Sequence, residues 1–285
     1  MTKFEFILAQ LKKTDKKNYE NYVVTRLYNL LNDPTIKFIT QQYIRRPNGY
    51  ALVDLYYPQF NLYVEIDESH HKDNITSDQL RHRDIVDATN FIEKRIIVYD
   101  RTQEEVDKQI DDLLNYIKNL KSEQIKNDLF VEWNIDSEMN PDYYIDLGYI
   151  DTKDNVSFQT QNDVFKCFGK LYEKRYWRCS IKHPSEKNTS VWCPKFFEHK
   201  DWYNELSEDY SVIKTKSKNK DHNLEDLCKR DKKVPYRYVF GHIISPLGGK
   251  SYKFLGLYKF NYNKSIEEGI RVYERVKTRT NTIKV

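Results

Sequence analysis

The stretch 50–71 contains the residues best suited to chemistry. Three carboxylates, Asp54, Glu65 and Asp67, lie in or at the ends of two apolar segments within it. Carboxylate oxygens are the ligands that Mg²⁺ prefers, and a bound divalent ion can activate water and neutralise charge on a phosphate. The spacing therefore predicts a metal site for phosphodiester hydrolysis, with these three acids as ligands.

Two predicted strands, 50–57 and 62–67, position these acids. Strand alternation places Glu65 and Asp67 on one face, and Asp54 lies opposite them if the hairpin pairs in the simplest register. The alternative is that the acids are ordinary exposed residues on a half-solvated sheet. Their neighbours are almost all apolar, however, and acids inside such strands are costly unless they are paired or metal-bound.

The surrounding elements predict a mixed α/β domain. Apolar residues at helical spacing predict helices over 4–12 and about 17–31, and the second helix carries Glu20. Glu20 either approaches the acids or belongs to a solvated helix face. Further elements are expected as strands over 36–43 and 95–99, a helix from about Asp78 to Phe91, and a long helix that begins at the capping box Thr102–Glu105 and ends near Leu120.

The second half predicts a different, β-rich domain with long loops. It contains Trp192, and then Trp202 and Asn204 before a lysine-rich loop. An aromatic wall with amide and carboxylate groups suits a pocket for a flipped base, although each tryptophan alone could be a core residue. We expect strands over 130–134, 143–150, 155–160, 175–182, 191–197, 236–244 and 251–262, and short helices over 163–171 and 265–276. The expected organisation is a domain over 1–121, a linker over 122–129 and a second domain over 130–285.

Composition narrows the class of protein. The chain has 285 residues, a net charge of +4 and four cysteines, all in the second half and none in a C-x-x-C pair. No apolar run approaches the roughly 20 residues that span a bilayer, and the first residues have no apolar secretion core. We therefore expect reduced thiols, no membrane partner and a cytoplasmic location. The mild positive charge permits a nucleic-acid partner without requiring one.

The pattern D-x₁₀-E-x-D-x₃-H from Asp54 to His71 resembles the very-short-patch-repair-endonuclease-like (Vsr-like) branch of the PD-(D/E)XK nucleases. In that branch the usual lysine of E-x-K is replaced, and here Asp67 occupies its position. The resemblance implies metal ligation by Asp54 and Glu65, a third acidic group at Asp67, and a general acid/base or phosphate contact at His71 or its neighbour His70. It also implies a helix glutamate at the site, for which Glu20 is the match. Because no cysteine precedes Cys167, the structural zinc site of the repair enzymes in this branch is missing, which argues against mismatch repair.

A Vsr-like nuclease followed by a β-rich domain resembles the modification-dependent restriction endonucleases of the AbaSI type. Those enzymes join the nuclease to an SRA-like (SET- and RING-associated), PUA-like curled-barrel domain. The resemblance implies Mg²⁺ as cofactor and double-stranded DNA containing 5-hydroxymethylcytosine, or its glucosylated form, as substrate. It implies cleavage at a distance by a homodimer. It further implies a modified-base pocket formed by Trp202, Asn204, Asp221 and Trp192. The lysine-rich loop would contact DNA phosphates through Lys214, Lys216, Lys218 and Lys220.

The sequence alone leaves two other functions open. The chain could be a reader of modified DNA with an inactive nuclease half. It could also be a structure-directed nuclease whose second domain holds nucleic acid without reading a modification. The intact set of acids argues against the first alternative.

Overall fold

The structure is a computed structural model, and it describes residues 1–46, 49–68, 91–172 and 178–284. The chain divides into two compact units. The first contains Met1–Ile135, and the second contains Asp136–Ser245 and Gly249–Val285. Within the described ranges, no helix combines the length and the apolar character needed to cross a bilayer.

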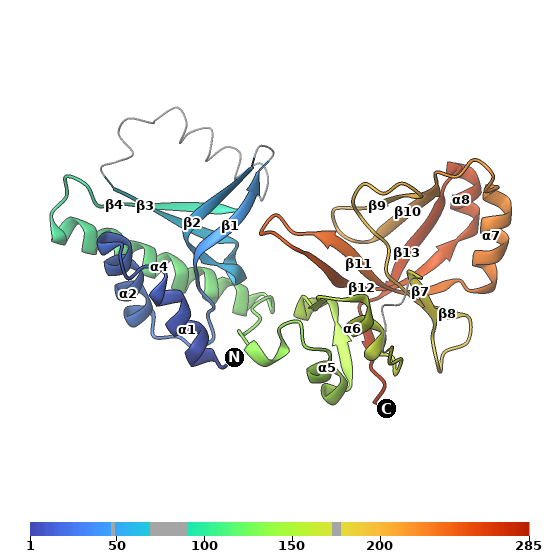
Figure 1. Cartoon of the computed structure of the whole chain (residues 1–285), viewed down its shortest axis with the longest axis horizontal. Coiled ribbons are helices and arrows are strands. Elements are labelled where there is room, and N and C mark those ends of the chain that lie inside the picture. Colours follow the sequence, from blue (N-terminus) through green and yellow to red (C-terminus); the bar gives the residue numbers. More distant parts are fainter. Residues whose placement is uncertain (47–48, 69–90, 173–177, 285) are drawn as a thin grey trace. The chain divides into compact units, whose positions relative to one another are not determined.

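The first unit is a four-stranded sheet covered on one face by helices (Figure 1). The strand order is β1-β2-β3-β4, with antiparallel pairing except between β3 and β4, which run parallel. The core lies between the sheet and the helices, and includes Leu27, Val64 and Ile110. This confirms the expected mixed sheet with helices against it. The elements are α1 (Lys3–Lys12), α2 (Asn18–Leu31), β1 (Ile39–Arg46), β2 (Gly49–Tyr57), β3 (Leu62–Asp67), β4 (Ile92–Ile97) and α4 (Gln103–Lys126).

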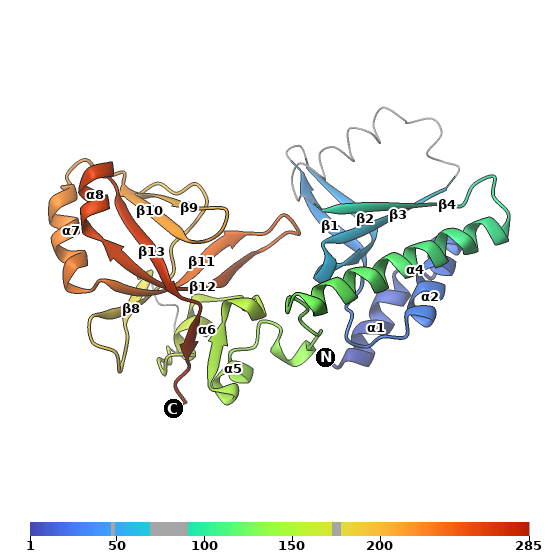
Figure 2. The same cartoon turned by 180° about the vertical axis from the view of Figure 1, so that it is seen from behind.

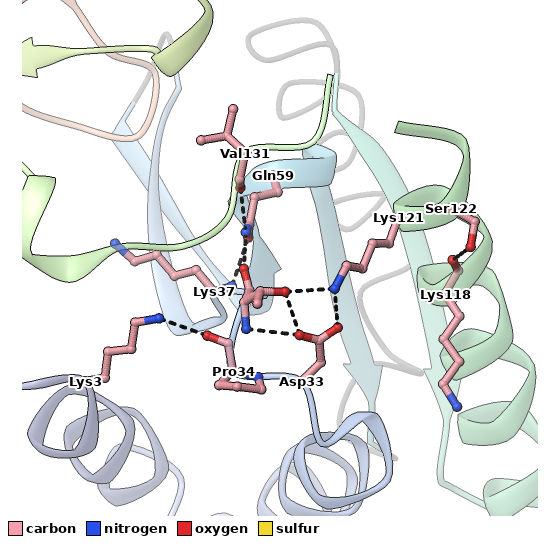
Figure 3. Close-up of polar contacts among 10 residues, drawn as sticks. Lys3, Asp33, Pro34, Lys37, Gln59, Lys118, Lys121, Ser122 and Val131 are labelled. Carbon is pink, nitrogen blue, oxygen red and sulfur yellow. Dashed lines mark hydrogen bonds and ion pairs between the residues drawn. The ribbon is translucent and has the colours of Figure 1, made fainter. Parts of the chain in front are cut away.

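Helix α4 begins at the predicted capping box, in which Thr102 and Glu105 exchange hydrogen bonds. It does not end near Leu120, but continues to Lys126 into the segment expected to be a linker. Figure 3 shows why this segment is held: Lys121 Nζ donates to Asp33 Oδ2 at 2.6 Å, and Gln59 Nε2 donates to the Val131 carbonyl at 3.2 Å. Lys121 and Val131, on either side of the expected linker, therefore contact the α2–β1 loop and the turn after β2, and within the linker Gln124 Nε2 donates to the Gln59 carbonyl at 2.9 Å.

Some expected elements of the first unit are displaced. The strand expected over 36–43 is β1, which begins three residues later, and the strand expected over 95–99 is β4, which begins three residues earlier. The segment expected as a strand over 130–134 is not a strand. The helix expected from about Asp78 to Phe91 falls almost entirely on residues outside the described ranges.

The second unit is built on a curled sheet in which β7-β8-β11-β12-β13-β10-β9 are neighbours and β6 pairs with β12. Strands β8 and β11 are parallel, and β14 pairs with β5 in a separate two-stranded sheet. Helices α7 and α8 lie side by side in both views (Figure 2). The strands are β5 (Tyr149–Asp151), β6 (Ser157–Phe158), β7 (Ser180–Lys182), β8 (Thr189–Trp192), β9 (Trp202–Leu206), β10 (Val212–Ser217), β11 (Tyr236–Ile244), β12 (Lys250–Asn261), β13 (Arg271–Lys277) and β14 (Arg279–Asn281); the helices are α5 (Pro141–Leu147), α6 (Gln161–Lys166), α7 (Leu224–Lys233) and α8 (Tyr262–Glu268).

Gly256 allows β12 to curl. The register with β11 shifts between Val239 and Phe240, and the register with β13 shifts next to the glycine. Gly256 has φ +111°, and an added Cβ would lie 2.5 Å from the Lys277 carbonyl oxygen. A side chain is excluded there by both the backbone conformation and the available space.

Local capping overrides β-propensity in several places. The strand expected over 143–150 is mostly the helix α5, because Asn140 caps its first turn, Pro141 occupies its first position and Gly148 ends it in a left-handed conformation. The helix expected over 265–276 is α8 followed by strand β13. Strands β9 and β10 and helix α7 were not predicted.

Candidate functional site

Asp54 lies where strands β2 and β3 separate. Their main-chain ladder ends at the Leu55–Val64 pair. Beyond this pair, the Ile66 N–H donates to the side-chain Oδ2 of Asp54 at 2.8 Å and not to a main-chain carbonyl. The Asp54 carboxylate is thus held between two strands, next to the residues that follow Val64.

Gln41 connects this carboxylate to helix α2. It has φ 50°, a left-handed conformation that is unfavourable for a residue with a side chain, and it interrupts the pairing of β1 with β2. Its Nε2 donates to Asp54 Oδ1 at 3.1 Å and to Glu20 Oε1 at 2.8 Å. Backbone strain of this kind gathers at functional sites, and here it directs one amide at two carboxylates.

Glu20 is buried next to Asp54 and does not lie on a solvated helix face. It is only 3 % exposed, and Lys17 Nζ donates to its Oε2 at 2.8 Å. Burial raises the pKa of Glu20, and the nearby charge of Asp54 raises it further. Two carboxylates from different elements therefore share one amide donor and repel each other.

The other two predicted acids lie on β3. Glu65 is 9 % exposed, and it continues the antiparallel register in which it would face Asp54. Asp67 is paired with Arg95, whose Nη1 lies 3.2 Å from both carboxylate oxygens. Arg95 Nε also donates to Glu93 at 2.6 Å. Arg95 was not predicted as a site residue, and its register position opposite Glu65 on β4 could be found only once the parallel pairing was known.

The donor set fits a hard divalent cation. Glu20, Asp54 and Glu65 supply only carboxylate oxygens, the ligands that Mg²⁺ prefers. Burial and the charge of Asp54 raise the pKa of Glu20 even though Lys17 is bonded to it, and a bound cation would relieve this cost. As the side chains stand, no three histidine, cysteine or acidic residues of the described ranges are grouped closely enough to hold a metal ion. His70 and His71 lie outside those ranges.

A large cavity in the second unit is the other candidate site. Its volume is about 1510 Å³, and Trp192, Trp202 and Asn204 are among its lining residues, as predicted for a base pocket. Trp202 is half-buried on β9, whereas Trp192 is 7 % exposed on β8 and also belongs to the core. Asn204 Nδ2 donates to the Lys195 carbonyl at 3.0 Å, which fixes the orientation of the amide.

The remaining predicted residues lie elsewhere. Asp221 is exposed in a turn and is not among the residues that line the cavity. Lys214 is on β10, where its Nζ lies 2.8 Å from Glu268. Lys216, also on β10, is exposed, as are Lys218 and Lys220 after that strand. Part of the expected lysine-rich loop is therefore a strand.

None of the seven arginines and lysines that line the cavity was predicted as a site residue. They come from six different segments, and among them only Arg230 lies in a local run of charge, at 229–233. One carboxylate of the described ranges, Asp201, lines the cavity with them. The basic residues are Arg178, Lys182, Lys195, Arg230, Arg237, Lys250 and Arg271.

An aromatic group lines another part of the same cavity. His242 stacks on Tyr252 with ring centroids 4.2 Å apart, and it meets Phe197 edge-on at 5.0 Å. Burial, together with the charges of Lys195 and Lys250, lowers the pKa of His242 to about 4. The imidazole is therefore neutral at physiological pH and behaves as a polar aromatic wall.

Both units match known families. Residues 4–139 match the family of restriction endonucleases described as "PvuRts1 I-like, N-terminal", and residues 143–282 match the "SET and RING associated domain". Among solved structures, the chain is similar to "The 5-Hydroxymethylcytosine-Specific Restriction Enzyme AbaSI", with 34% sequence identity, a TM-score of 0.62, and coverage of 98% of this chain and 97% of that chain. The chain belongs to the AbaSI-type restriction endonucleases. No curated protein matches it.

Membership of the AbaSI-type family confirms the expected architecture. The sheet that carries Asp54 and Glu65 lies in the restriction-endonuclease unit, and the cavity lies in the SRA unit. In this AbaSI-type endonuclease, the acids and the cavity are therefore built by separate units of one chain.

Proposed function

We propose that this AbaSI-type enzyme is a Mg²⁺-dependent endonuclease that cleaves double-stranded DNA containing 5-hydroxymethylcytosine or its glucosylated form. The proposal is supported most directly by one observation: an SRA unit whose cavity is lined by Trp202 and Asn204 follows a nuclease unit in which Glu20 and Asp54 share an amide. The similar solved structure is named as specific for 5-hydroxymethylcytosine. Chain-long similarity at 34% identity supports the same base class for this enzyme.

In the nuclease unit, Asp54 and Glu65 would hold the cation, with Glu20 and Asp67 as further acidic groups. The bound Mg²⁺ would supply an activated water and a counter-charge for the phosphate. Gln41 and the Ile66 N–H hold Asp54 in one orientation, so the carboxylate need not reorganise when it binds a cation. We assign proton transfer or a phosphate contact to His71, with His70 as its neighbour, on the motif alone.

In the SRA unit, the cavity would receive a base rotated out of the duplex. Stacking on a tryptophan holds any base, so discrimination must come from polar groups. The bond from Asn204 Nδ2 to the Lys195 carbonyl fixes the amide, so that its Oδ1 can accept from the cytosine amino group. A hydroxymethyl group adds a donor and an acceptor, and a polar site left unpaired by an unmodified cytosine would weaken its binding.

Positive charge around the cavity would hold the backbone. Seven arginine and lysine side chains line the cavity. Lys216, Lys218 and Lys220 are exposed and follow Thr215, another lining residue. Contacts of this kind bind phosphates without reading sequence and weaken steeply with salt. Lys214 is partly neutralised by Glu268 and would contribute least. Asp221, in its exposed turn, would act only if that turn moves to the ligand.

A double-strand break requires two nuclease sites, since one site hydrolyses one strand. We therefore propose a homodimer in which each protomer reads one modified cytosine and cuts at a distance from it.

The test uses the whole chain and matched duplexes that carry cytosine, 5-methylcytosine, 5-hydroxymethylcytosine or its glucosylated form. We expect Mg²⁺-dependent cleavage of the last two and little cleavage of the first. Asp54→Asn should abolish cleavage while preserving the preference in binding. Equal cleavage of all four duplexes would refute the reading function, and cleavage by Asp54→Asn would refute the assigned nuclease site.

A further inference from the structure

A buried carboxylate lies behind the cavity wall without lining it. Asp231 of α7 is 1 % exposed and is not among the cavity residues. Its Oδ1 accepts from Arg237 Nη2 at 2.6 Å. Its Oδ2 accepts from Arg271 Nη1 at 2.8 Å and from the Tyr273 hydroxyl at 2.7 Å. One acid thus fixes side chains from both β11 and β13.

The two arginines in turn contact the two tryptophans of the cavity. The Arg271 guanidinium lies 4.8 Å from the ring centroid of Trp202, and the Arg237 guanidinium lies 5.0 Å from that of Trp192. All four side chains line the cavity. Each arginine therefore bridges a buried carboxylate and a ring that faces the ligand space.

Few other contacts hold the guanidinium groups. The Nε atoms of both arginines are buried and have no hydrogen-bond partner among the described residues. Arg271 Nη2 reaches Thr215 Oγ1 at a long 3.4 Å. The planes of both guanidiniums therefore depend chiefly on Asp231 and on the ring faces that they touch.

The cluster also carries an excess of positive charge. One carboxylate faces two guanidiniums, and the side chains of Asp231 and Arg271 are 1% and 5% exposed. Burying charges is expensive, and a well-packed apolar cluster is often at least as stable. An arrangement of this cost is better explained by the precise placement of the tryptophans than by stability alone.

We propose that Asp231 is a positioning residue for base recognition: through Arg271 and Arg237 it sets the ring planes of Trp202 and Trp192, and so determines how well the cavity distinguishes a modified cytosine. This inference rests on the proposed reading function. Asp231 itself touches no ligand.

The test compares Asp231→Asn with Tyr273→Phe in the whole chain, each in an Asp54→Asn background that prevents cleavage. Asp231→Asn keeps the side-chain shape but removes the charge that pairs with both arginines. Tyr273→Phe removes one hydrogen bond to the same carboxylate and leaves both arginine pairs in place. Binding is measured on matched duplexes with cytosine or 5-hydroxymethylcytosine, and unfolding midpoints are measured in parallel.

We expect Asp231→Asn to lower the ratio of affinities for the two duplexes at least tenfold, while affinity for the unmodified duplex changes less than twofold. Tyr273→Phe should lower the unfolding midpoint and keep the ratio within twofold of the parent. If Asp231→Asn does not fold, Arg271→Lys replaces it. A lysine still pairs with Asp231 but offers no planar group to Trp202, so the same loss of preference is expected.

Two results would overturn the inference. In one, the folded Asp231→Asn or Arg271→Lys variant keeps the parental preference. In the other, Tyr273→Phe loses preference in the same proportion to its loss of stability as Asp231→Asn, which would make Asp231 a purely structural residue. A parent protein without any preference would instead refute the proposed reading function, and this inference with it.

Discussion

Substituting Gln41 should separate the nuclease chemistry from the fold. The Gln41 amide donates to Glu20 at 2.8 Å and to Asp54 at 3.1 Å. A hydrogen bond to a charged group contributes about 1.5–3 kcal/mol, and about 1.4 kcal/mol corresponds to a tenfold change in rate. Substituting a residue that orients a metal ligand typically lowers metal affinity or activity by roughly 10–100-fold. We expect Gln41→Ala to lower the cleavage rate at subsaturating Mg²⁺ within that range.

The pH dependence gives a second readout of the same substitution. Burial raises the pKa of Glu20, and the Gln41 hydrogen bond opposes that effect. Without the amide, the pKa of Glu20 rises further. Because the carboxylate must be deprotonated to bind a cation, the acid limb of the rate profile should move to higher pH. The assay is single-turnover cleavage of a 5-hydroxymethylcytosine duplex across pH and Mg²⁺ concentration.

The matched control is Gln42→Ala. Gln42 is the next residue on β1, and its amide donates to the Tyr43 carbonyl at 2.7 Å, with no bond to either acid. It should keep the parental rate and acid limb. Gln41→Gly separates the loss of the amide from the effect of the backbone conformation. The alanine and glycine variants both lose the amide, but only alanine pays the roughly 1 kcal/mol cost of the left-handed conformation. A Gln41→Ala protein with parental rate, Mg²⁺ dependence and acid limb would refute the assigned positioning role.

Three other substitutions test individual contacts. Glu20→Gln should increase the free energy of unfolding at neutral pH by on the order of 1 kcal/mol while impairing cleavage. Because the folded-state pKa of Glu20 is raised, protonation of Glu20 stabilises the parent protein at low pH. Chemical denaturation of the parent should show that this stabilisation is lost as pH rises through the folded-state pKa. Asp33→Ala removes the 2.6 Å ion pair with Lys121 and should lower the unfolding free energy by about 1–2 kcal/mol, seen by denaturation, without changing cleavage by folded enzyme. Trp202→Ala should weaken binding of the modified duplex by about 1–3 kcal/mol, and Trp202→Phe by much less, measured by fluorescence anisotropy.

The hairpin of the nuclease unit was predictable because its signals are local. Alternation over β2 and β3 gave the strand ends closely, and the capping box located the start of α4. What the sequence could not show is that Asp54 is bonded to Ile66 N–H through its side chain, or that Gln41 adopts a left-handed backbone. Both depend on how three strands and one helix meet, and neither leaves a pattern in the residues nearby.

The second unit was predicted less well because more of its features depend on contacts between distant segments. Strands β11 and β12 are long and rich in β-formers, and β11 was predicted residue for residue. Strand β9 begins at Trp202 and β10 contains Lys214 and Lys216, whose polar neighbours indicated a loop. The basic residues of the cavity come from distant segments, so only the folded sheet brings them together.

The pairing of β14 with β5 determines when the second unit can finish folding during synthesis. Thr280 pairs with Ile150, so this part of the second unit can close only after roughly 130 further residues have been made, which takes on the order of 10 seconds at usual translation rates. The core of the first unit is made of residues 23–117, and it can fold long before that. Each ribosome therefore carries a nuclease unit ahead of the unit that directs it. Such an order of synthesis favours a nuclease unit that binds DNA weakly by itself, since a strong binder could cut the genome during every round of translation.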